Sequence, residues 1–170
     1  AWSARFWTKS QTEKRKYDRN WCESVRVLSD RLSVTFNDNL LIPSFDAGKQ
    51  LRTISAWGQK TQEDLSRLRI GIVGLGSVGS IVAEILARTG FSKFVLIDFD
   101  AVEEKNLDRT TFLQEDVGRA KVFAMKDAIT RSATSPSLDV RCIEYSICEK
   151  EGFYASLDCD VIFSCVDRPW

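Results

Sequence analysis

The chain has 170 residues, of which 44% are hydrophobic and 28% are charged, so it can bury a core of its own. Its 24 lysines and arginines balance its 24 aspartates and glutamates, and this neutral total favours neither a nucleic acid nor an acidic membrane surface as the partner. The chain contains no histidine, which excludes Ser-His-Asp catalysis, Cys-His catalysis and histidine-ligated zinc from the residues present.

The N-terminal third of the chain carries the weakest structural signals. Strand-like or alternating patterns occur at residues 4–8, 24–28 and 31–36. Asn37-Asp38-Asn39 is a turn signal, and the mixed charges of residues 9–19 favour a solvated turn or linker. We expect residues 1–58 to form a β-rich N-terminal extension, for which the tail of an upstream domain is one interpretation. Residues 59–68 then indicate a helix.

A glycine-rich loop follows an apolar strand predicted at residues 69–73. It reads Gly74-Leu75-Gly76-Ser77-Val78-Gly79 and leads directly into a helical pattern. In a loop of this kind Gly74 permits the tight turn, Gly76 lets the backbone approach a phosphate, and Gly79 lets the helix lie close to the strand. The free amide groups and the dipole at the start of the helix favour an anion there.

The helix is predicted to run from Ser77 to Thr89, with Gly90 as its C-terminal stop. Apolar residues at helical spacing predict the face that packs on a sheet: Val78, Ile81, Val82, Ile85 and Leu86. A second strand at residues 93–97 ends in Asp98, about 20 residues beyond the last glycine, where the dinucleotide fingerprint places its ribose-binding acid. By themselves these features also fit an NAD-binding domain.

Helices and strands continue to alternate in the rest of the chain. Helices are predicted at residues 121–132 and 152–157, and strands at residues 139–145 and 161–164, the last of these in the centre of the sheet. The inward-facing residues are expected to be Val122, Met125, Ile129, Val140, Cys142 and Tyr145. This alternation predicts an α/β fold, Rossmann-like and doubly wound, with a mostly parallel sheet.

The segment after Asp98 departs from a dehydrogenase pattern, which would continue into a helix. It reads Phe99-Asp100-Ala101-Val102-Glu103-Glu104-Lys105-Asn106-Leu107-Asp108-Arg109, and later Gly118-Arg119-Ala120-Lys121. Together with the glycine loop it resembles the adenylating domain of the ThiF, MoeB and ubiquitin-activating enzyme superfamily, whose pattern is GxGxxG, then D-x-D-x-V-x-x-x-N-x-x-R, then a lysine. Cys165-Val166-Asp167 resembles the C-T-D type motif of that family, although Arg168-Pro169 follows where the family commonly has asparagine.

The resemblance implies an acyl-adenylate-forming adenylyltransferase that depends on ATP and Mg²⁺. The residues expected to shape the pocket and to bind the ribose and the phosphates of ATP are Gly74, Gly76, Gly79, Asp98, Asn106, Arg109 and Lys121. The resemblance assigns Arg109, Lys121 and Asp167 to the catalytic site, with Asp167 as the magnesium ligand. Asp100 is either an acid on the magnesium side or a loop-capping acid, and we favour capping because carboxylates readily close turns. Taken singly, each of these residues has an ordinary structural interpretation as a turn residue, a surface charge or a strand-end acid.

The substrate implied by the resemblance is the C-terminal carboxylate of a ubiquitin-like or sulfur-carrier protein, or of a peptide. A carboxylate is already ionised near neutral pH, so adenylation needs no general base. Arg52 is the candidate for an arginine that reaches the γ-phosphate of a neighbouring subunit, which implies a homodimer. An NAD-dependent oxidoreductase and a catalytically silent ThiF-like scaffold subunit stay open as alternatives.

The five cysteines show neither C-x-x-C spacing nor an even number, so neither a disulfide framework nor a zinc site is expected. Cys148 is the candidate for the thioester-forming cysteine that some relatives use. The resemblance makes residues 59–170 an incomplete adenylating domain. With no signal peptide and no membrane-spanning run, we expect a cytoplasmic protein without a membrane partner. Nucleic acid is not expected as a partner, although a tRNA substrate stays open.

Overall fold

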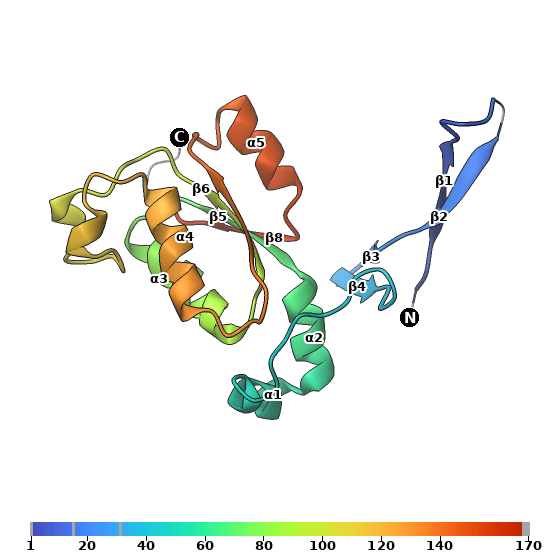
Figure 1. Ribbon diagram of the computed structural model, residues 1–170, viewed down its shortest axis with the longest axis horizontal. Coiled ribbons are helices and arrows are strands. Elements are labelled where there is room, and N and C mark those ends of the chain that lie inside the picture. Colours follow the sequence, from blue (N-terminus) through green and yellow to red (C-terminus); the bar gives the residue numbers. More distant parts are fainter. Residues whose placement is uncertain (1, 15, 31, 168–170) are drawn as a thin grey trace. The chain divides into compact units, whose positions relative to one another are not determined.

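The computed structural model describes residues 2–14, 16–30 and 32–167. The chain divides into two compact units, Ala1–Pro43 and Ser44–Trp170 (Figure 1). The division falls after Pro43, so residues 44–58, which the sequence analysis grouped with the N-terminal extension, lie in the larger unit.

The smaller unit consists of two antiparallel hairpins. Strand β1 (Arg5–Lys9) pairs with β2 (Tyr17–Trp21), and β3 (Ser24–Leu28) pairs with β4 (Leu32–Phe36). The β-rich character expected of this region is therefore present, and the strands pair with one another. The prediction of a turn or linker over residues 9–19 is wrong for Lys9, which lies in β1, and for Tyr17 to Arg19, which lie in β2. Every side chain of β2 is exposed, so the strand has no buried face to produce an alternating apolar pattern.

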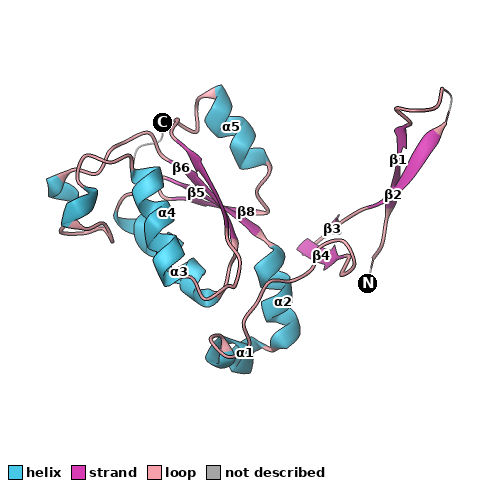
Figure 2. Cartoon of the chain, in the orientation of Figure 1, coloured by secondary structure: helices cyan, strands magenta, loops and turns pink. Residues whose placement is uncertain are grey.

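The larger unit is built on a four-stranded parallel sheet in the order β7-β6-β5-β8 (Figure 2). Its strands are β5 (Arg69–Val73), β6 (Lys93–Ile97), β7 (Asp139–Ile143) and β8 (Val161–Ser164). Helices α3 (Ser77–Thr89) and α4 (Lys121–Ser132) share one core with Ile72 and Phe94. Helix α5 (Lys150–Leu157) adds Ala155 to a second, smaller cluster around Val95. Helices thus cover both faces of the sheet, which confirms the doubly wound α/β fold.

The face by which α3 packs on the sheet differs from the predicted one. Its buried residues are small: Gly79, Ser80, Ala83 and Ala87. Val78, Ile81 and Ile85 are exposed, whereas Val82 and Leu86 are partly buried against the core as predicted. The reason is close packing, since a helix that lies this near to a sheet has room only for side chains of one or two heavy atoms.

Two predictions at the C-terminal end of the sheet are also wrong. Strand β8 pairs only with β5 and so lies at an edge of the sheet within the described residues, with Val161 and Ile162 exposed. Strand β7 ends at Ile143, and Tyr145 lies beyond it with an exposed side chain. The inward positions of Val140 and Cys142 are confirmed.

Two short helices, α1 (Leu51–Trp57) and α2 (Gln59–Arg67), precede the sheet. The predicted helix at residues 59–68 is confirmed by α2, whereas α1 was not predicted. The buried Gln62 amide donates to Gln50 Oε1 and to the carbonyl of Thr89, both at 2.9 Å. Gln50 directly precedes α1, and Thr89 is the last residue of α3. The Gln62 amide therefore links α1 and α2 to the C-terminal end of α3. Among the described residues no helix is long and apolar enough to cross a membrane.

Candidate functional site

A cavity of about 770 Å³ lies at the carboxyl ends of β5, β6 and β8. Its walls are the glycine loop, the segment from Asp98 to Lys121, the turn after β7 and the end of β8. Of the predicted site residues, the following line it: Gly74, Gly76, Asp98, Asn106, Arg109, Lys121 and Asp167. The carboxyl ends of parallel strands are where open α/β sheets bind their ligands, so the sheet itself places this cavity.

The glycine loop has the geometry that the sequence predicts. Gly74 has φ 85°, a left-handed value that favours glycine, and a Cβ atom there would lie 3.0 Å from the carbonyl oxygen of Cys165. A Cβ atom on Gly79 would lie 1.9 Å from the carbonyl oxygen of Gly74, so α3 approaches the loop too closely for any side chain. Gly76 has open space around its Cβ position, on the cavity wall, where a ligand could approach the backbone.

Asp98 connects the glycine loop to the segment that follows β6. Its buried carboxylate accepts hydrogen bonds from the backbone N–H of Leu75 (2.6 Å) and of Asp100 (2.8 Å). Each of its two oxygens accepts one of these hydrogen bonds. Asp98 therefore holds the two walls of the cavity together besides facing it.

The segment between Asp98 and Lys121 is closed at its base by a short antiparallel pairing. The N–H of Val102 donates to the carbonyl of Arg119, the N–H of Gly118 donates to the carbonyl of Val102, and Ala101 bridges to Ala120. This base fixes the start of α4, where the ammonium group of Lys121 lies 2.8 Å from Asp100 Oδ2. The turn-capping role predicted for the side chain of Asp100 is wrong, because its carboxylate pairs with Lys121 instead.

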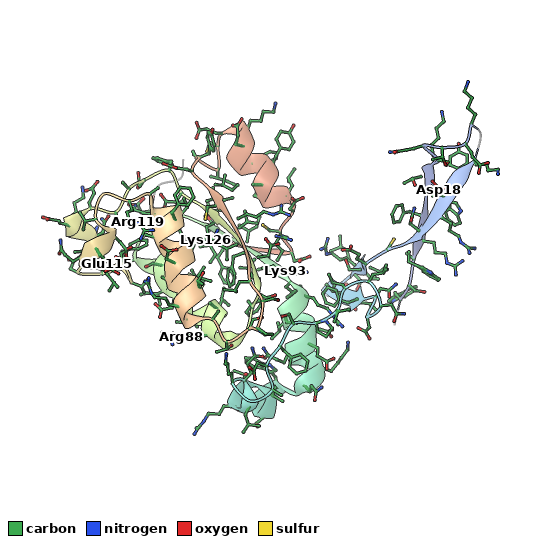
Figure 3. All side chains as sticks on the ribbon, viewed as in Figure 1. Asp18, Arg88, Lys93, Glu115, Arg119 and Lys126 are labelled. Atoms are coloured by element: carbon green, nitrogen blue, oxygen red, sulfur yellow. The ribbon has the colours of Figure 1, made fainter. Side chains whose placement is uncertain are left out.

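Arg119, which Figure 3 labels, makes two ion pairs next to this antiparallel pairing. Its guanidinium donates to Asp127 (2.6 Å) on α4 and to the buried carboxylate of Asp116 (2.8 Å). The hydrogen bond to Asp127 and the nearby negative charges outweigh desolvation and raise the pKa of Arg119. Asp116 also accepts from the N–H of Leu113, so this arginine links the connecting segment to the first turns of α4.

Asn106 and Arg109 lie in the tip of the segment, around the short 3₁₀ helix η1 (Glu104–Asn106). The side-chain oxygen of Asn106 accepts from the N–H of Glu103 (3.0 Å), which leaves its amide nitrogen as a donor. Nη1 of Arg109 donates to the carbonyl of Lys105 and to Asp108. The other nitrogens of that guanidinium have no partner among the described residues, so they are available to an anion.

Asp167 is an exposed carboxylate just beyond β8, on the cavity wall. Magnesium is typically held by one or two carboxylates together with substrate phosphates and water. Within the described ranges no cluster of three or more His, Cys, Asp or Glu side chains could hold a metal ion alone. Asp167 offers one carboxylate on the cavity wall, which could serve as a protein ligand of a magnesium ion that arrives with a bound phosphate compound.

The cavity is also lined by residues that the sequence analysis did not assign to the site, among them several from the turn after β7 and from the end of β8. They include Tyr145, Ser146, Ile147, Ser164 and Cys165, with Cys148 alongside. Burial raises the pKa of the Cys165 thiol, which makes it a poor nucleophile near neutral pH. All five cysteines are free. These residues reach the cavity because β7 and β8 end at the same edge of the sheet as β5 and β6, which no sequence spacing indicates.

Two predicted residues do not line the cavity. Gly79 packs α3 against the loop from behind, and Arg52 is exposed on α1. The role of Gly79 is therefore to shape the pocket without forming its wall. Arg52 does not lie in the cavity of its own chain, so its role in a neighbouring subunit stays a prediction.

The comparison with protein families identifies the chain. The sequence pattern described as the ThiF family matches residues 48–169. This chain belongs to the ThiF family. The match covers both short helices, and it also covers the glycine loop, the connecting segment, the turn after β7 and the end of β8, which line the cavity.

Proteins similar to this ThiF-family chain include ubiquitin-like modifier-activating enzymes and two E. coli proteins of known structure. Ubiquitin-like modifier-activating enzyme 5 of Drosophila sechellia is 32% identical over an alignment of 161 residues, which covers 85% of this chain and 39% of that protein. The E. coli tRNA N6-threonylcarbamoyladenosine dehydratase TcdA, in complex with ATP, matches 72% of this chain and 50% of its own with 29% identity and a TM-score of 0.65. E. coli MccB with MccA-N7isoASN matches 72% of this chain and 37% of its own at 25% identity and a TM-score of 0.61.

Proposed function

We propose that this chain binds ATP with Mg²⁺ and adenylates the C-terminal carboxylate of a ubiquitin-like or sulfur-carrier protein, or of a peptide. One observation carries the proposal: a single cavity is lined by Asp98, Asn106, Arg109 and Lys121 from one segment and by Asp167 from beyond β8. Its volume of about 770 Å³ is within the usual range for a small-molecule site. Membership of the ThiF family and the ATP complex of TcdA support the same choice of ligand.

Each residue has a part in that chemistry. The open backbone at Gly76 and the start of α3 would hold phosphate oxygens, and Asp98 would accept hydrogen bonds from the ribose hydroxyls. The free guanidinium nitrogens of Arg109 and the two unused donors of Lys121 would neutralise charge on the phosphates. Magnesium held by Asp167 would supply Lewis-acid stabilisation of the same charge.

The attacking group belongs to the substrate. Its carboxylate is ionised near neutral pH, so the chain has to position it and stabilise charge without removing a proton. The chain spans 39% of the length of the activating enzyme that it matches. We therefore state its contacts to a protein or peptide substrate as a proposal. We propose that the ATP-binding part includes residues before 59, a choice supported by the place of α1 and of the preceding residues from Ser44 in the larger unit.

Two other functions would use the same fold. An NAD-dependent oxidoreductase would share the glycine loop and Asp98, but the charged segment with Arg109 and Lys121 offers nothing for hydride transfer. A silent scaffold subunit would keep the fold and lose the charged residues, all of which are present and line the cavity.

We further propose that the active form is a homodimer in which Arg52 reaches the neighbouring active site. Its exposed position outside the cavity of its own chain is consistent with this role. Mixing Arg52→Ala chains with Lys121→Ala chains should restore part of the activity that each variant lacks. No restoration in a mixture of folded variants would overturn the role in trans.

Exchange of radiolabelled pyrophosphate into ATP tests the proposed reaction. The exchange should require a carrier protein or peptide with a free C-terminal carboxylate and should disappear when that carboxylate is amidated. Exchange at the same rate with the amidated substrate would contradict the proposal.

A further inference from the structure

The β1–β2 hairpin carries a face that the proposed adenylation does not use. The register pairs Arg5 with Trp21, Trp7 with Arg19 and Lys9 with Tyr17. Residues directly opposite each other in an antiparallel pair lie on the same face, and so do alternate residues along each strand. These six residues therefore share one face, on which every cross-strand pair joins one cation to one aromatic ring. We call this the cation-aromatic face.

Two contacts support this assignment of faces. The guanidinium carbon of Arg5 lies 3.7 Å from the ring centroid of Trp21, within the cation-aromatic face. On the other face the side-chain amide of Asn20 donates to the hydroxyl of Thr8 (3.4 Å). Because the two contacts fall on alternate positions of the same strands, they fix which residues lie on which side.

Charge separates cleanly between the two faces of the hairpin. The cation-aromatic face has three cations and no carboxylate. Asp18, which Figure 3 labels on this hairpin, lies opposite Thr8 on the other face. In the connecting turn Lys16 pairs with Glu13, so that cation is largely neutralised. The cation-aromatic face therefore carries only positive charge, which neither the neutral total charge of the chain nor the mixed composition of residues 9–19 indicates.

The aromatic rings of this face are open to solvent. Trp7 is 61% exposed, Tyr17 is 67% exposed and Trp21 is 46% exposed. A globular domain normally covers rings of this size, and an exposed group of them marks a binding surface. A ligand for this face must offer negative charge at several points and flat groups that can stack between those points.

We propose that the cation-aromatic face binds single-stranded nucleic acid. Phosphates of a single strand would meet the cations, and its unpaired bases would stack on the neighbouring rings, which is how sequence-tolerant single-strand binders combine the two kinds of contact. Strands rise by about 3.3 Å per residue, so the three rungs extend over roughly 13 Å, enough for a few nucleotides. A duplex would not fit, since its bases are already stacked on one another.

Fluorescence anisotropy of a labelled single-stranded oligouridylate of about twelve nucleotides, titrated with the full chain, tests the proposal. Excess ATP is included to keep the oligonucleotide out of the nucleotide cavity. Three phosphate contacts predict that affinity falls about 20-fold between about 50 mM and 200 mM salt. Trp7→Ala should weaken binding about 5- to 150-fold, the range of one lost stacking contact, whereas Trp7→Phe should keep most of it.

The hairpin offers a matched control for both kinds of contact. Phe6→Ala removes an aromatic ring from the opposite face and should leave the affinity unchanged. The double variant Lys9→Gln and Arg19→Gln removes two exposed charges without disturbing packing, and it should reduce the dependence on salt to that of about one phosphate contact. Magnesium-ATP binding should be the same in all of these variants, because none of these residues lines the nucleotide cavity.

Several results would overturn the proposal. One is no binding of the oligonucleotide at low salt, and another is equal loss of affinity in Phe6→Ala and Trp7→Ala. Equal affinity for single-stranded and double-stranded probes would also contradict it, because stacking requires unpaired bases. Binding to vesicles of anionic lipid in the absence of any oligonucleotide binding would assign the face to a membrane surface instead.

Discussion

The carboxylate of Asp98 lies 2.6 Å from the backbone nitrogen of Leu75, and its second oxygen lies 2.8 Å from the backbone nitrogen of Asp100. One side chain thus joins the glycine loop to the segment that carries the charged residues of the cavity. Because Asp98 is buried, neither of these backbone groups can easily exchange it for water. Asp98 is therefore important for the shape of the site as well as for any ligand.

We expect Asp98→Asn to lower both stability and nucleotide affinity. An amide has a single acceptor oxygen, so its NH₂ group would face one of the two N–H donors and leave it unsatisfied, at a cost of about 1–3 kcal/mol. Urea unfolding and ATP calorimetry measure the two effects. Asp158→Asn is the control, because its ion pair with Arg141 is exposed and should be worth less than about 1 kcal/mol. Equal losses of stability in the two variants would contradict the joining role.

The two glycines on either side of the start of α3 should separate folding from binding. Gly79→Ala should destabilise the chain by about 1–3 kcal/mol, because the new methyl group would overlap the carbonyl of Gly74. Gly76→Ala should leave the midpoint of thermal unfolding nearly unchanged, since its Cβ position is open, and should still weaken ATP binding. A Gly76→Ala variant that binds ATP normally would show that phosphate does not approach the loop at this residue.

Lys121 should matter for catalysis and not for folding. We expect Lys121→Ala to abolish adenylation and to weaken ATP binding about 10- to 100-fold, the scale of one charge-assisted hydrogen bond. Asp167→Ala should abolish adenylation as well. Lys126→Ala, on the exposed side of the same helix, is the matched control and should bind ATP normally. Circular dichroism checks that the variants remain folded. Retained turnover in both the Lys121 and Asp167 variants would refute the assignment of the site.

Local sequence patterns predict much of this fold. Strand β5, the glycine loop and the end of α3 at Gly90 each depend on neighbouring residues, and all three lie where the pattern places them. The face of α3 could not be predicted from hydrophobicity, because the close approach to Gly74 selects small residues over the larger Ile81 and Ile85. The helical pattern shows which residues of α3 are apolar, but it does not show how closely the helix approaches the sheet.

The candidate site is predictable in its residues and less so in its contacts. The order and spacing of the motifs bring Asp98, Asn106, Arg109, Lys121 and Asp167 to one cavity. The pairing of Asp100 with Lys121 requires the antiparallel closure at Ala101 and Ala120, which joins residues far apart in sequence. Strand β2 could not be predicted either, since all of its side chains are exposed and give no alternating apolar pattern.

The cysteines provide a chemical test of the cavity. Cys148 is exposed and lines it, whereas burial raises the pKa of Cys142, Cys159 and Cys165 and so lowers their thiolate fraction at any given pH. We expect iodoacetamide at about pH 8 to alkylate Cys148 well before those three. Magnesium-ATP should slow the reaction of Cys148 by occupying the cavity. Peptide mass spectrometry measures both rates, and no protection by ATP would place the nucleotide elsewhere.

The choice between ATP and NAD⁺ is the central question, because both ligands suit a glycine loop followed by an acid at the end of the second strand. Isothermal titration calorimetry of this chain with each ligand, in the presence and absence of Mg²⁺, answers it most directly. We predict binding of ATP that strengthens with Mg²⁺ and no detectable binding of NAD⁺. Binding of NAD⁺ without binding of ATP would contradict the adenylation proposal and the phosphate-binding roles of Arg109 and Lys121.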